Sequence, residues 1–419
     1  MRLTKITMKN FAPFADGEME FPAVEGAEGL AEVHLFTGEN GTGKTRVLAA
    51  LMGALGNLIP LQDRVRQDSG AEIEVFASEW GGLWRFRDGA EDPKTPSMPI
   101  QMDIFDNVFA MGGSGIALLE EAQSGTAQDL KIARAHECLT LSGAVGGSGI
   151  IQRLMKLRMG VALERDAAPN AQEAGRLTAC LQKLEQAICE ITGHGFALQV
   201  QQGRELKLIA QWDGQRLFFS ELPDGLRSLL NWLAGWVVLQ SEHFEHSADP
   251  LSCAVTLILD EPENHLHPAW QRRVLPALQK LFPKAQMFVV THSPFVVSSL
   301  NAGWIHKFTR DAKGVVKIEA PKKASRGDSY MTAVQEILDL TEWFDPETEQ
   351  EIADFETSLD KAYANNGSSV DEMRLKADKL SKRSQEVTNL VMGLVAQFDR
   401  TAESGKAKPK MEPKRNIKL

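Results

Sequence analysis

A glycine-rich segment near the start of the chain restricts the possible folds more than any other feature. The stretch "FTGENGTGKT" (residues 36–45) contains Gly-x-x-x-x-Gly-Lys-Thr, the P-loop or Walker A pattern. An apolar, strand-like run over 32–37 precedes it, and a helical pattern over 44–59 follows. Because glycines let successive backbone N–H groups curl round phosphates at a helix N-terminus, the segment predicts a strand–loop–helix unit that binds a nucleotide.

The P-loop pattern assigns roles to individual residues. Lys44 is expected to reach the β- and γ-phosphates of ATP, and the Thr45 hydroxyl is expected to ligate Mg²⁺. A plain glycine turn is the alternative, but the strand before and the helix after are the context that a P-loop requires. The predicted nucleotide-binding residues of this segment are Gly38, Asn40, Gly41, Gly43, Lys44 and Thr45.

A second candidate motif lies more than two hundred residues further on. The stretch "VTLILDEPENHLHP" (255–268) has the pattern of a fully buried strand that ends in Asp260 and Glu261. Two adjacent acids at the carboxyl edge of a parallel sheet are costly unless a cation is near. Taken alone, the segment fits an exposed Asp-Glu-Pro turn equally well. Together with the P-loop, it predicts that Asp260 holds Mg²⁺ and that Glu261 polarises the water that attacks the γ-phosphate.

A third segment, "MFVVTHSP" (287–294), is another apolar strand pattern, and it ends in Thr291, His292 and Ser293. A histidine at a strand end is more often a structural residue with satisfied hydrogen bonds. Because this segment follows the other two motifs in the order of a nucleotide site, we predict instead that His292 senses the γ-phosphate and acts as a catalytic switch.

Together these segments resemble the ABC-type ATPase heads of the RecF/SMC class, and in particular the OLD-like AAA ATPases of bacterial anti-phage defence systems (the AriA and PtuA type). "RLTKITMKNFAPF" resembles the opening strand of that class, "GENGTGKT" its P-loop, "LILDEPENHLHP" its Walker B and D-loop, and "VVTHSP" its histidine switch. The resemblance covers roughly residues 1–60 and 215–300. It implies a head-to-head dimer, in which each ATP is held by the P-loop of one chain and the signature motif of the other.

The segment in the place of that signature motif is "SELPDGLRSLL", which begins at Ser220. Members of the class commonly have Leu-Ser-x-Gly-x-Arg here. Gly225 and Arg227 match this pattern and are expected to face the partner's γ-phosphate, whereas Pro223 occupies the serine position. The hydroxyl contact is then either missing or supplied by Ser220 or Ser228, and a missing hydroxyl suggests slow hydrolysis with ATP holding the dimer together. A simple loop and helix N-cap is the alternative interpretation.

The resemblance leaves other assignments open. The Q-loop glutamine is either Gln62 or Gln101. Asn264 and His265 fall in the D-loop stretch, which the class places at the dimer interface. The basic segment "QRLMKLRMG" (152–160) fits either a solvated helix face, which is the favoured interpretation, or a surface that follows a nucleic-acid backbone.

The bulk composition excludes some classes of protein. Apolar residues make up 43% of the 419 positions, and the net charge of −10 argues against general electrostatic binding of nucleic acid. The start "MRLTKITMKNF" contains no signal-peptide core, and no run of about 18 apolar residues could cross a membrane. We therefore expect a cytoplasmic protein whose cysteines are free thiols, since no Cys-x-x-Cys pair occurs among Cys138, Cys180, Cys189 and Cys253.

The expected fold class is α/β: a P-loop ABC-ATPase head with a mostly parallel sheet, an antiparallel strand group, an inserted helical lobe and a helical C-terminal region. Residues 1–125 are expected to form the N-terminal lobe of the ATPase core and 196–320 the C-terminal lobe, on either side of the helical insertion at 126–195. Residues 321–419 are expected to be helical and to end in a basic disordered tail. Within that region, 345–364 and 370–398 are expected to be two helices.

Three functions of different classes remain. The favoured one is an ATP-hydrolysing dimer, or higher homo-oligomer, that acts as sensor or scaffold in a bacterial defence or DNA-transaction complex. Its effector would be a separate, nuclease-like protein, since the chain after His292 shows neither a TOPRIM pattern nor an HNH-like histidine cluster. The second is a RecF-like repair ATPase that binds DNA directly, against which the acidic composition counts. The least favoured is the ATPase subunit of a transporter, whose serine-glycine-glycine signature the chain lacks.

Overall fold

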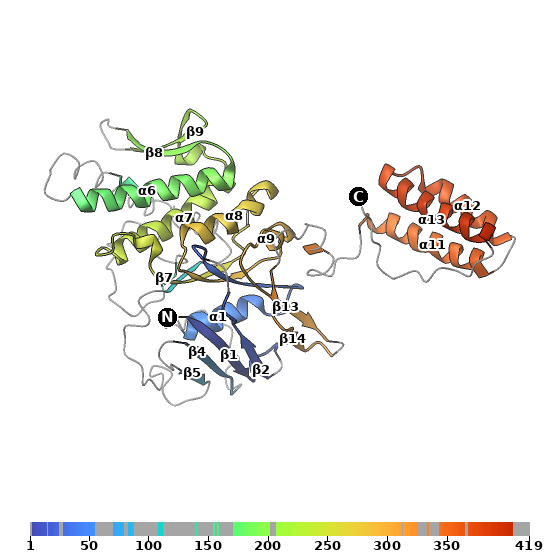
Figure 1. Ribbon diagram of the computed structural model, residues 1–419, viewed down its shortest axis with the longest axis horizontal. Coiled ribbons are helices and arrows are strands. Elements are labelled where there is room, and N and C mark those ends of the chain that lie inside the picture. The colour runs from blue at the N-terminus through green and yellow to red at the C-terminus, as the bar shows by residue number, and fades with distance from the viewer. Residues whose placement is uncertain are drawn as a thin grey trace. The chain divides into compact units, whose positions relative to one another are not determined.

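The computed structural model describes residues 2–14, 16–24, 28–54, 70–78, 83–87, 108–111, 139–140, 154–155, 157–158, 171–201, 207–311, 313–324, 333–334, 343–364 and 368–404. By its internal contacts the chain divides into two compact units, Met1–Asp339 and Leu340–Leu419, and both are drawn in Figure 1.

A mostly parallel sheet forms the centre of the first unit. Within the described residues its strands follow the order β14–β13–β3–β12–β11–β6–β7, with β15 paired to β13. All neighbouring pairs from β13 to β7 are parallel, whereas β14 and β15 run antiparallel to β13. The strand bounds are β3 Glu32–Gly38, β6 Val108–Met111, β7 Leu139–Thr140, β11 Thr256–Asp260, β12 Gln286–Val290, β13 Gly303–Arg310, β14 Val316–Ile318 and β15 Lys322–Lys323.

The middle residues of β11 and β12 are apolar because both faces of the sheet are covered. On β11, Leu257 and Leu259 pack into one hydrophobic cluster, while Ile258 between them packs into the cluster on the opposite face. Met287 and Phe288 on β12 divide between the same two clusters. The alternation of side chains along a strand therefore places the sheet between two layers.

One face of this sheet is covered by an antiparallel sheet and a helix. The antiparallel sheet has the order β2–β1–β4–β5, and helix α1 (Lys44–Ala54) lies between it and the central strands, as Figure 1 shows. Phe21, Phe36 and Phe288 meet in the buried layer, with ring centroids of Phe21 and Phe288 4.9 Å apart. The bounds are β1 Leu3–Lys9, β2 Gly17–Glu20, β4 Glu72–Ala77 and β5 Leu83–Arg87.

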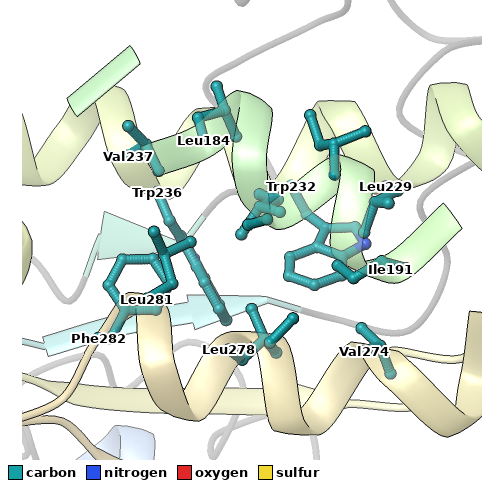
Figure 2. Close-up of a cluster of buried hydrophobic side chains, with 14 of the residues drawn as sticks. Leu184, Ile191, Leu229, Trp232, Trp236, Val237, Val274, Leu278, Leu281 and Phe282 are labelled. Atoms are coloured by element: carbon teal, nitrogen blue, oxygen red, sulfur yellow. The ribbon is translucent and has the colours of Figure 1, made fainter. Parts of the chain in front are cut away.

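Long helices cover the other face. Figure 2 shows Trp232 and Trp236 of α7 packed against Leu278 of α8, with Leu184 and Ile191 from α6 beside them. The two tryptophan rings meet edge to face, with centroids 5.4 Å apart. A small antiparallel sheet, β10–β9–β8, adjoins these helices. The bounds are α6 Ala171–Thr192, β8 Phe196–Gln201, β9 Lys207–Trp212, β10 Gln215–Phe218, α7 Asp224–His243, α8 Pro268–Leu281 and α9 Pro294–Ser298.

The described part of the second unit consists of the helices α11 (Pro346–Ala364), α12 (Ser368–Leu380) and α13 (Gln385–Ser404) around their own hydrophobic cluster. The expectation of one helix over 370–398 is wrong, because the helix is broken after Leu380. The hydroxyl of Ser384 accepts a hydrogen bond from the backbone N–H of Val387 at 3.2 Å and so begins a new helix.

The α/β fold with a mostly parallel sheet and an antiparallel strand group is confirmed. The four predicted domain ranges stay predictions, since most of 126–170 lies outside the described residues. Cys180, Cys189 and Cys253 are free thiols, and Cys138 is outside the described part. No described helix is both long and apolar enough to span a membrane.

Candidate nucleotide-binding site

The glycine loop joins β3 to α1, as the P-loop pattern predicts. Gly38, Gly41 and Gly43 have φ of 138°, 76° and 86°, a backbone region that favours glycine. A Cβ on Gly38 would lie 2.2 Å from the backbone oxygen of Phe308, and one on Gly43 would lie 2.6 Å from the Phe14 ring. The bare backbone is therefore required by both conformation and packing. Asn40 is exposed in the same loop.

The ammonium group of Lys44 lies within the curve of this loop. Its Nζ donates to the backbone oxygens of Gly38 at 2.9 Å and Glu39 at 2.7 Å, and it lies 3.4 Å from the Thr42 hydroxyl. Burial lowers the pKa of Lys44 to about 8, against the opposing effect of the nearby carboxylates of Glu261, Asp260 and Glu39. The loop thus holds a cation against its own carbonyl oxygens.

Asp260 is brought to the P-loop from the far end of the sequence. Its strand β11 and the P-loop strand β3 flank β12, and all three run parallel, so their carboxyl ends meet at one edge of the sheet. The Thr45 hydroxyl lies 3.3 Å from Asp260 Oδ1. A hydroxyl and a carboxylate at this separation are the oxygen donors that Mg²⁺ takes when it also binds phosphates, so these residues fit the predicted metal ligands.

Glu261 and His292 lie together at the same edge. The N–H of Glu261 donates to the Val290 oxygen at 2.9 Å and so continues the pairing of β11 with β12, whereas its φ of 50° ends the extended strand. Its Oε1 lies 3.7 Å from His292 Nε2, and both side chains are about one-third exposed (37% and 36%). Burial and the charge of Lys44 lower the pKa of His292, while Glu261 opposes the shift. The imidazole is therefore favoured in its neutral form.

Residues around Glu261 complete this edge. The side-chain amide of Asn264 donates to Glu261 Oε2 at 3.0 Å. His265 has a φ of 65° and is exposed, and the Nδ1 of His267 accepts from the N–H of Ala269 to begin α8. The D-loop stretch, residues 263–267, is thus a tight turn anchored to Glu261 at one side and to α8 at the other.

The predicted signature segment enters α7, whose first turn contains Gly225 and Arg227, while Ser220 and Pro223 precede the helix. A Cβ on Gly225 would lie 2.7 Å from the backbone oxygen of His265, so this glycine lets α7 pack on the D-loop of its own chain. The guanidinium of Arg227 pairs with Asp224. Ser228 is buried whereas Ser220 is exposed, so Ser220 is the hydroxyl of the two that a second chain can reach. Their roles toward a partner's nucleotide stay predictions.

Sequence reasoning missed some residues of the site. Glu263 is buried, and its carboxylate holds the backbone of the His292 segment. Arg310 of β13 donates to the Gly41 oxygen at 2.8 Å, from outside every motif that the sequence shows. The Q-loop candidates Gln62 and Gln101, and the basic residues Arg153 and Lys156, lie outside the described residues.

Comparison with known families gives two matches, one on each side of the region that is least described. Residues 5–84 match a family described as "AAA domain". Residues 210–298 match a family described as "AAA domain, putative AbiEii toxin, Type IV TA system". The first match contains the P-loop, and the second contains the signature segment, Asp260, Glu261 and His292.

Curated relatives match over parts of their length. The Septu protein PtuA of Bacillus thuringiensis is 24% identical over 201 residues, which are 47% of this chain and 50% of PtuA. The "Retron Ec83 probable ATPase" of Escherichia coli is 30% identical over 130 residues, 30% of this chain and 23% of the relative. The chain thus spans half or less of the length of these relatives. The matches confirm the resemblance to this group of ATPases.

The solved structures that align with this chain include heads of SMC proteins. An SMC head bound to the C-terminal winged-helix domain of ScpA aligns with a TM-score of 0.46 at 14% identity, over 77% of this chain and 98% of that chain. The SMC head domain from Thermotoga maritima aligns with a TM-score of 0.40 at 16% identity, over 76% and 99%.

Proposed function

We propose that this chain, an ABC/SMC-like ATPase similar to ATPases of bacterial defence systems, binds ATP with Mg²⁺ and hydrolyses it in a homodimer. The observation that carries the proposal is the contact of 3.3 Å between the hydroxyl of Thr45 and the carboxylate of Asp260, residues 215 positions apart. The folding of two such distant segments onto one phosphate loop supports a site for a triphosphate and its metal ion.

Each residue of the site has a chemical task in this proposal. Lys44 exchanges its bonds to the Gly38 and Glu39 oxygens for the β- and γ-phosphates. Thr45 and Asp260 hold the metal, which neutralises phosphate charge when bound. Glu261 accepts a proton from the attacking water, and His292 beside it donates a hydrogen bond to the γ-phosphate. The partly exposed positions of Glu261 and His292 leave them accessible to water and nucleotide.

The position of α7 supports the proposed dimer. Its first turn is open to solvent at Asp224 and carries Gly225, so the positive end of a 20-residue helix is available to a phosphate on a second chain. Contact between Gly225 and His265 within one chain links that turn to the D-loop. A second copy that presents its nucleotide there would therefore act on both segments at once. A higher homo-oligomer built from such dimers uses the same contact.

The cellular role in this proposal is that of a sensor or scaffold in anti-phage defence, with a separate, nuclease-like effector. The similarity to the Septu protein PtuA and to retron ATPases supports the defence role. The trigger and the effector act through the ATP-bound dimer. Direct binding of nucleic acid is not required by the proposal.

Two variants test the nucleotide site. Lys44→Ala is expected to lose ATP binding, and Glu261→Gln is expected to bind ATP while its hydrolysis falls by on the order of 100-fold or more. Fluorescent-nucleotide titration and phosphate release measure the two steps separately. Lys280→Ala, which removes an exposed lysine of the Glu190 ion pair, is the matched control and is expected to behave like wild type.

The same variants test the dimer. Glu261→Gln with ATP and Mg²⁺ is expected to accumulate as a dimer in light scattering after size exclusion, and Arg227→Ala in that background is expected to weaken it. A pull-down from the native host with and without ATP identifies the effector. Rapid hydrolysis by a strictly monomeric wild-type protein would contradict the dimer, and normal hydrolysis by Glu261→Gln would contradict the role of this residue.

A further inference from the structure

Glu263 is a buried carboxylate to which the proposed chemistry gives no task. It is the first residue of the D-loop stretch, two positions after Glu261, and only 7% of its surface is exposed. Burial raises its pKa, and the hydrogen bonds that it accepts only partly oppose this shift. A buried carboxylate destabilises the fold unless hydrogen bonds compensate for the lost solvation. The contacts of Glu263 therefore indicate its role.

Its side chain accepts hydrogen bonds from the segment that carries His292. Glu263 Oε1 accepts from the Thr291 hydroxyl, from the backbone N–H of His292 at 3.1 Å and from that of Ser293 at 3.2 Å. These donors belong to consecutive residues that follow strand β12, where the Thr291 N–H makes the last bond to β3, at 3.1 Å from the Phe36 oxygen. A single oxygen therefore fixes the backbone on both sides of the switch histidine.

The second oxygen of Glu263 takes no part in this arrangement. Oε2 is buried and has no hydrogen-bond partner among the described residues. The contacts need an acceptor at Oε1 and do not by themselves need a negative charge. Replacement by glutamine keeps the acceptor, whereas replacement by leucine removes it from the His292 N–H and the Thr291 hydroxyl, and the Ser293 N–H keeps only the Thr291 hydroxyl, at 3.0 Å.

A second contact joins the same two segments. The Ser293 hydroxyl donates to Oε1 of Gln271 at 2.6 Å, and the amide of Gln271 donates to the Leu266 oxygen at 2.9 Å. Gln271 lies in the first turn of α8, the helix that begins immediately after the D-loop. The D-loop and the His292 segment are thus tied both through Glu263 and through Gln271, so a displacement of one displaces the other.

We propose that Glu263 is the positioning residue of the His292 switch: its Oε1 holds His292 opposite Glu261 and couples the switch to the D-loop. The coupling to hydrolysis rests on the proposed function of His292, while the positioning does not. In a dimer, a partner that contacts the D-loop would move His292 through this carboxylate. Glu263 itself neither touches the nucleotide nor accepts the proton in this scheme.

The test compares Glu263→Gln with Glu263→Leu in the full chain labelled with ¹⁵N-histidine. The His292 ring signals are assigned by their loss in His292→Ala. We expect Glu263→Leu to shift them and Glu263→Gln to leave them near the wild-type positions. For hydrolysis, Glu263→Leu is expected to lower kcat by on the order of 100-fold with little change in KM for ATP. Glu263→Gln is expected to stay within a few-fold of wild type.

Control variants separate positioning from general destabilisation. Gln279→Leu removes two buried hydrogen bonds at the far end of α8, to the oxygens of Ala31 and Ala302, and is expected to leave the His292 signals unchanged. If Glu263→Leu does not fold, Thr291→Val and Thr291→Ser ask the same question, because only serine keeps the hydroxyl donor. Valine is then expected to shift the signals, and serine is expected to restore them.

The outcomes decide between distinct explanations. Unshifted His292 signals in Glu263→Leu, or in Thr291→Val where that replaces it, overturn the proposal. A loss of kcat in Glu263→Gln as large as that in Glu263→Leu also overturns it, since the charge rather than the acceptor would then matter. If the wild-type protein does not hydrolyse ATP, the proposed function fails, but the histidine spectra still decide whether Glu263 positions His292.

Discussion

Lys44 illustrates at the residue scale how the loop prepares for a ligand. Only 4% of the residue is exposed. Its ammonium group is held by oxygens of its own loop, and three carboxylates are near enough to favour its charge. Burial nevertheless outweighs these charges and lowers its pKa to about 8. The strongly negative phosphates of a nucleotide raise a pKa that burial has lowered, so they restore the charged form of the lysine.

This lowered pKa predicts that ATP binding takes up a proton above neutral pH. In the nucleotide-free protein much of Lys44 is neutral at about pH 8.5, because its pKa is about 8. Phosphates raise that pKa, so binding at this pH protonates the lysine, whereas at pH 7 it is already charged. ATP affinity is therefore expected to fall as pH rises through 8. Calorimetry in two buffers of different ionisation enthalpy measures the uptake.

Lys44→Arg is the control for this linkage. The pKa of an arginine side chain lies above ~12, so the guanidinium stays charged through the whole range. Proton uptake at about pH 8.5 is expected to be lost in the variant, even where ATP binding is weakened. Equal uptake by the variant and by wild type would assign the proton to another group.

Gly225 gives a second prediction at this scale. It lies inside helix α7, yet a Cβ would come within 2.7 Å of the backbone oxygen of His265. Gly225→Ala is therefore expected to destabilise by about 1–3 kcal/mol, since the helix must move off the D-loop. Gly175→Ala, in α6 with nothing within 4 Å of the added carbon, is expected to be neutral or to stabilise by up to about 1 kcal/mol. Urea unfolding of both variants measures the difference.

At the element scale, the contact between β3 and β13 contains a series of hydrogen-bonded polar side chains that no sequence pattern indicates. His34 Nε2 lies 2.7 Å from Glu32 Oε1, and His34 Nδ1 lies 3.1 Å from His306 Nε2. Arg2 donates to both oxygens of Glu32. His306 Nδ1 is buried without a partner among the described residues. These contacts indicate that His34 donates to Glu32 and accepts from His306, with both rings neutral.

These hydrogen-bonded side chains predict a loss of stability in mild acid. Burial lowers the pKa of His34 and lowers that of His306 well below its usual value, so between pH 7 and 5 the unfolded state binds more protons than the folded state. The free energy of unfolding is then expected to fall with pH, by up to about 2 kcal/mol for each histidine. The lowered pKa of Glu32, for which hydrogen bonds to His34 and Arg2 outweigh burial, adds a loss in a more acidic range.

Paired variants test the source of this acid sensitivity. His306→Phe fits an aromatic ring into the same layer and removes one titrating group, so its unfolding free energy is expected to vary less between pH 7 and 5 than that of wild type. His246→Gln changes a histidine whose side chain is 95% exposed and is expected to keep the wild-type slope. Urea titrations at several pH values give the slopes. A His306→Phe slope equal to that of wild type would place the acid-sensitive group elsewhere.

Elements with an unbroken apolar pattern are predictable from the sequence. Features that depend on contacts between distant segments of the chain are not. The apolar run before "DEPE" correctly predicts β11, and the run before "THSP" correctly predicts β12. Strands that are buried on both faces need apolar residues. The position of Asp260 beside Thr45 also follows from the motifs and their place at strand ends. Glu263, by contrast, lies in a polar stretch of sequence that is typical of an exposed turn. In the structure it is buried, and it accepts hydrogen bonds from three donors 28 to 30 residues away.

At the scale of the whole molecule, the chain consists of units with separate cores. In the second unit, buried positions recur every three or four residues along each helix, as in Ile352, Phe355 and Leu359 of α11 and Val387 and Val391 of α13. Arg383 pairs with Glu347 and Glu351, which ties the turn before α13 to the first helix. The missed break after Leu380 has a local cause: serine and lysine are tolerated inside helices, and only the cap at Ser384 separates α12 from α13.

This separate core predicts that residues 340–419 fold without the first unit. Expressed alone, the fragment is expected to show helical circular dichroism and a cooperative urea transition, because its buried apolar residues contact one another. Phe355→Ala is expected to destabilise it by about 3–5 kcal/mol, enough to unfold a unit of this size. Leu375→Ala, at a side chain on α12 that is 72% exposed, is expected to change stability by less than about 0.5 kcal/mol. A fragment that melts without cooperativity, or equal effects of the two substitutions, would show that this core depends on the rest of the chain.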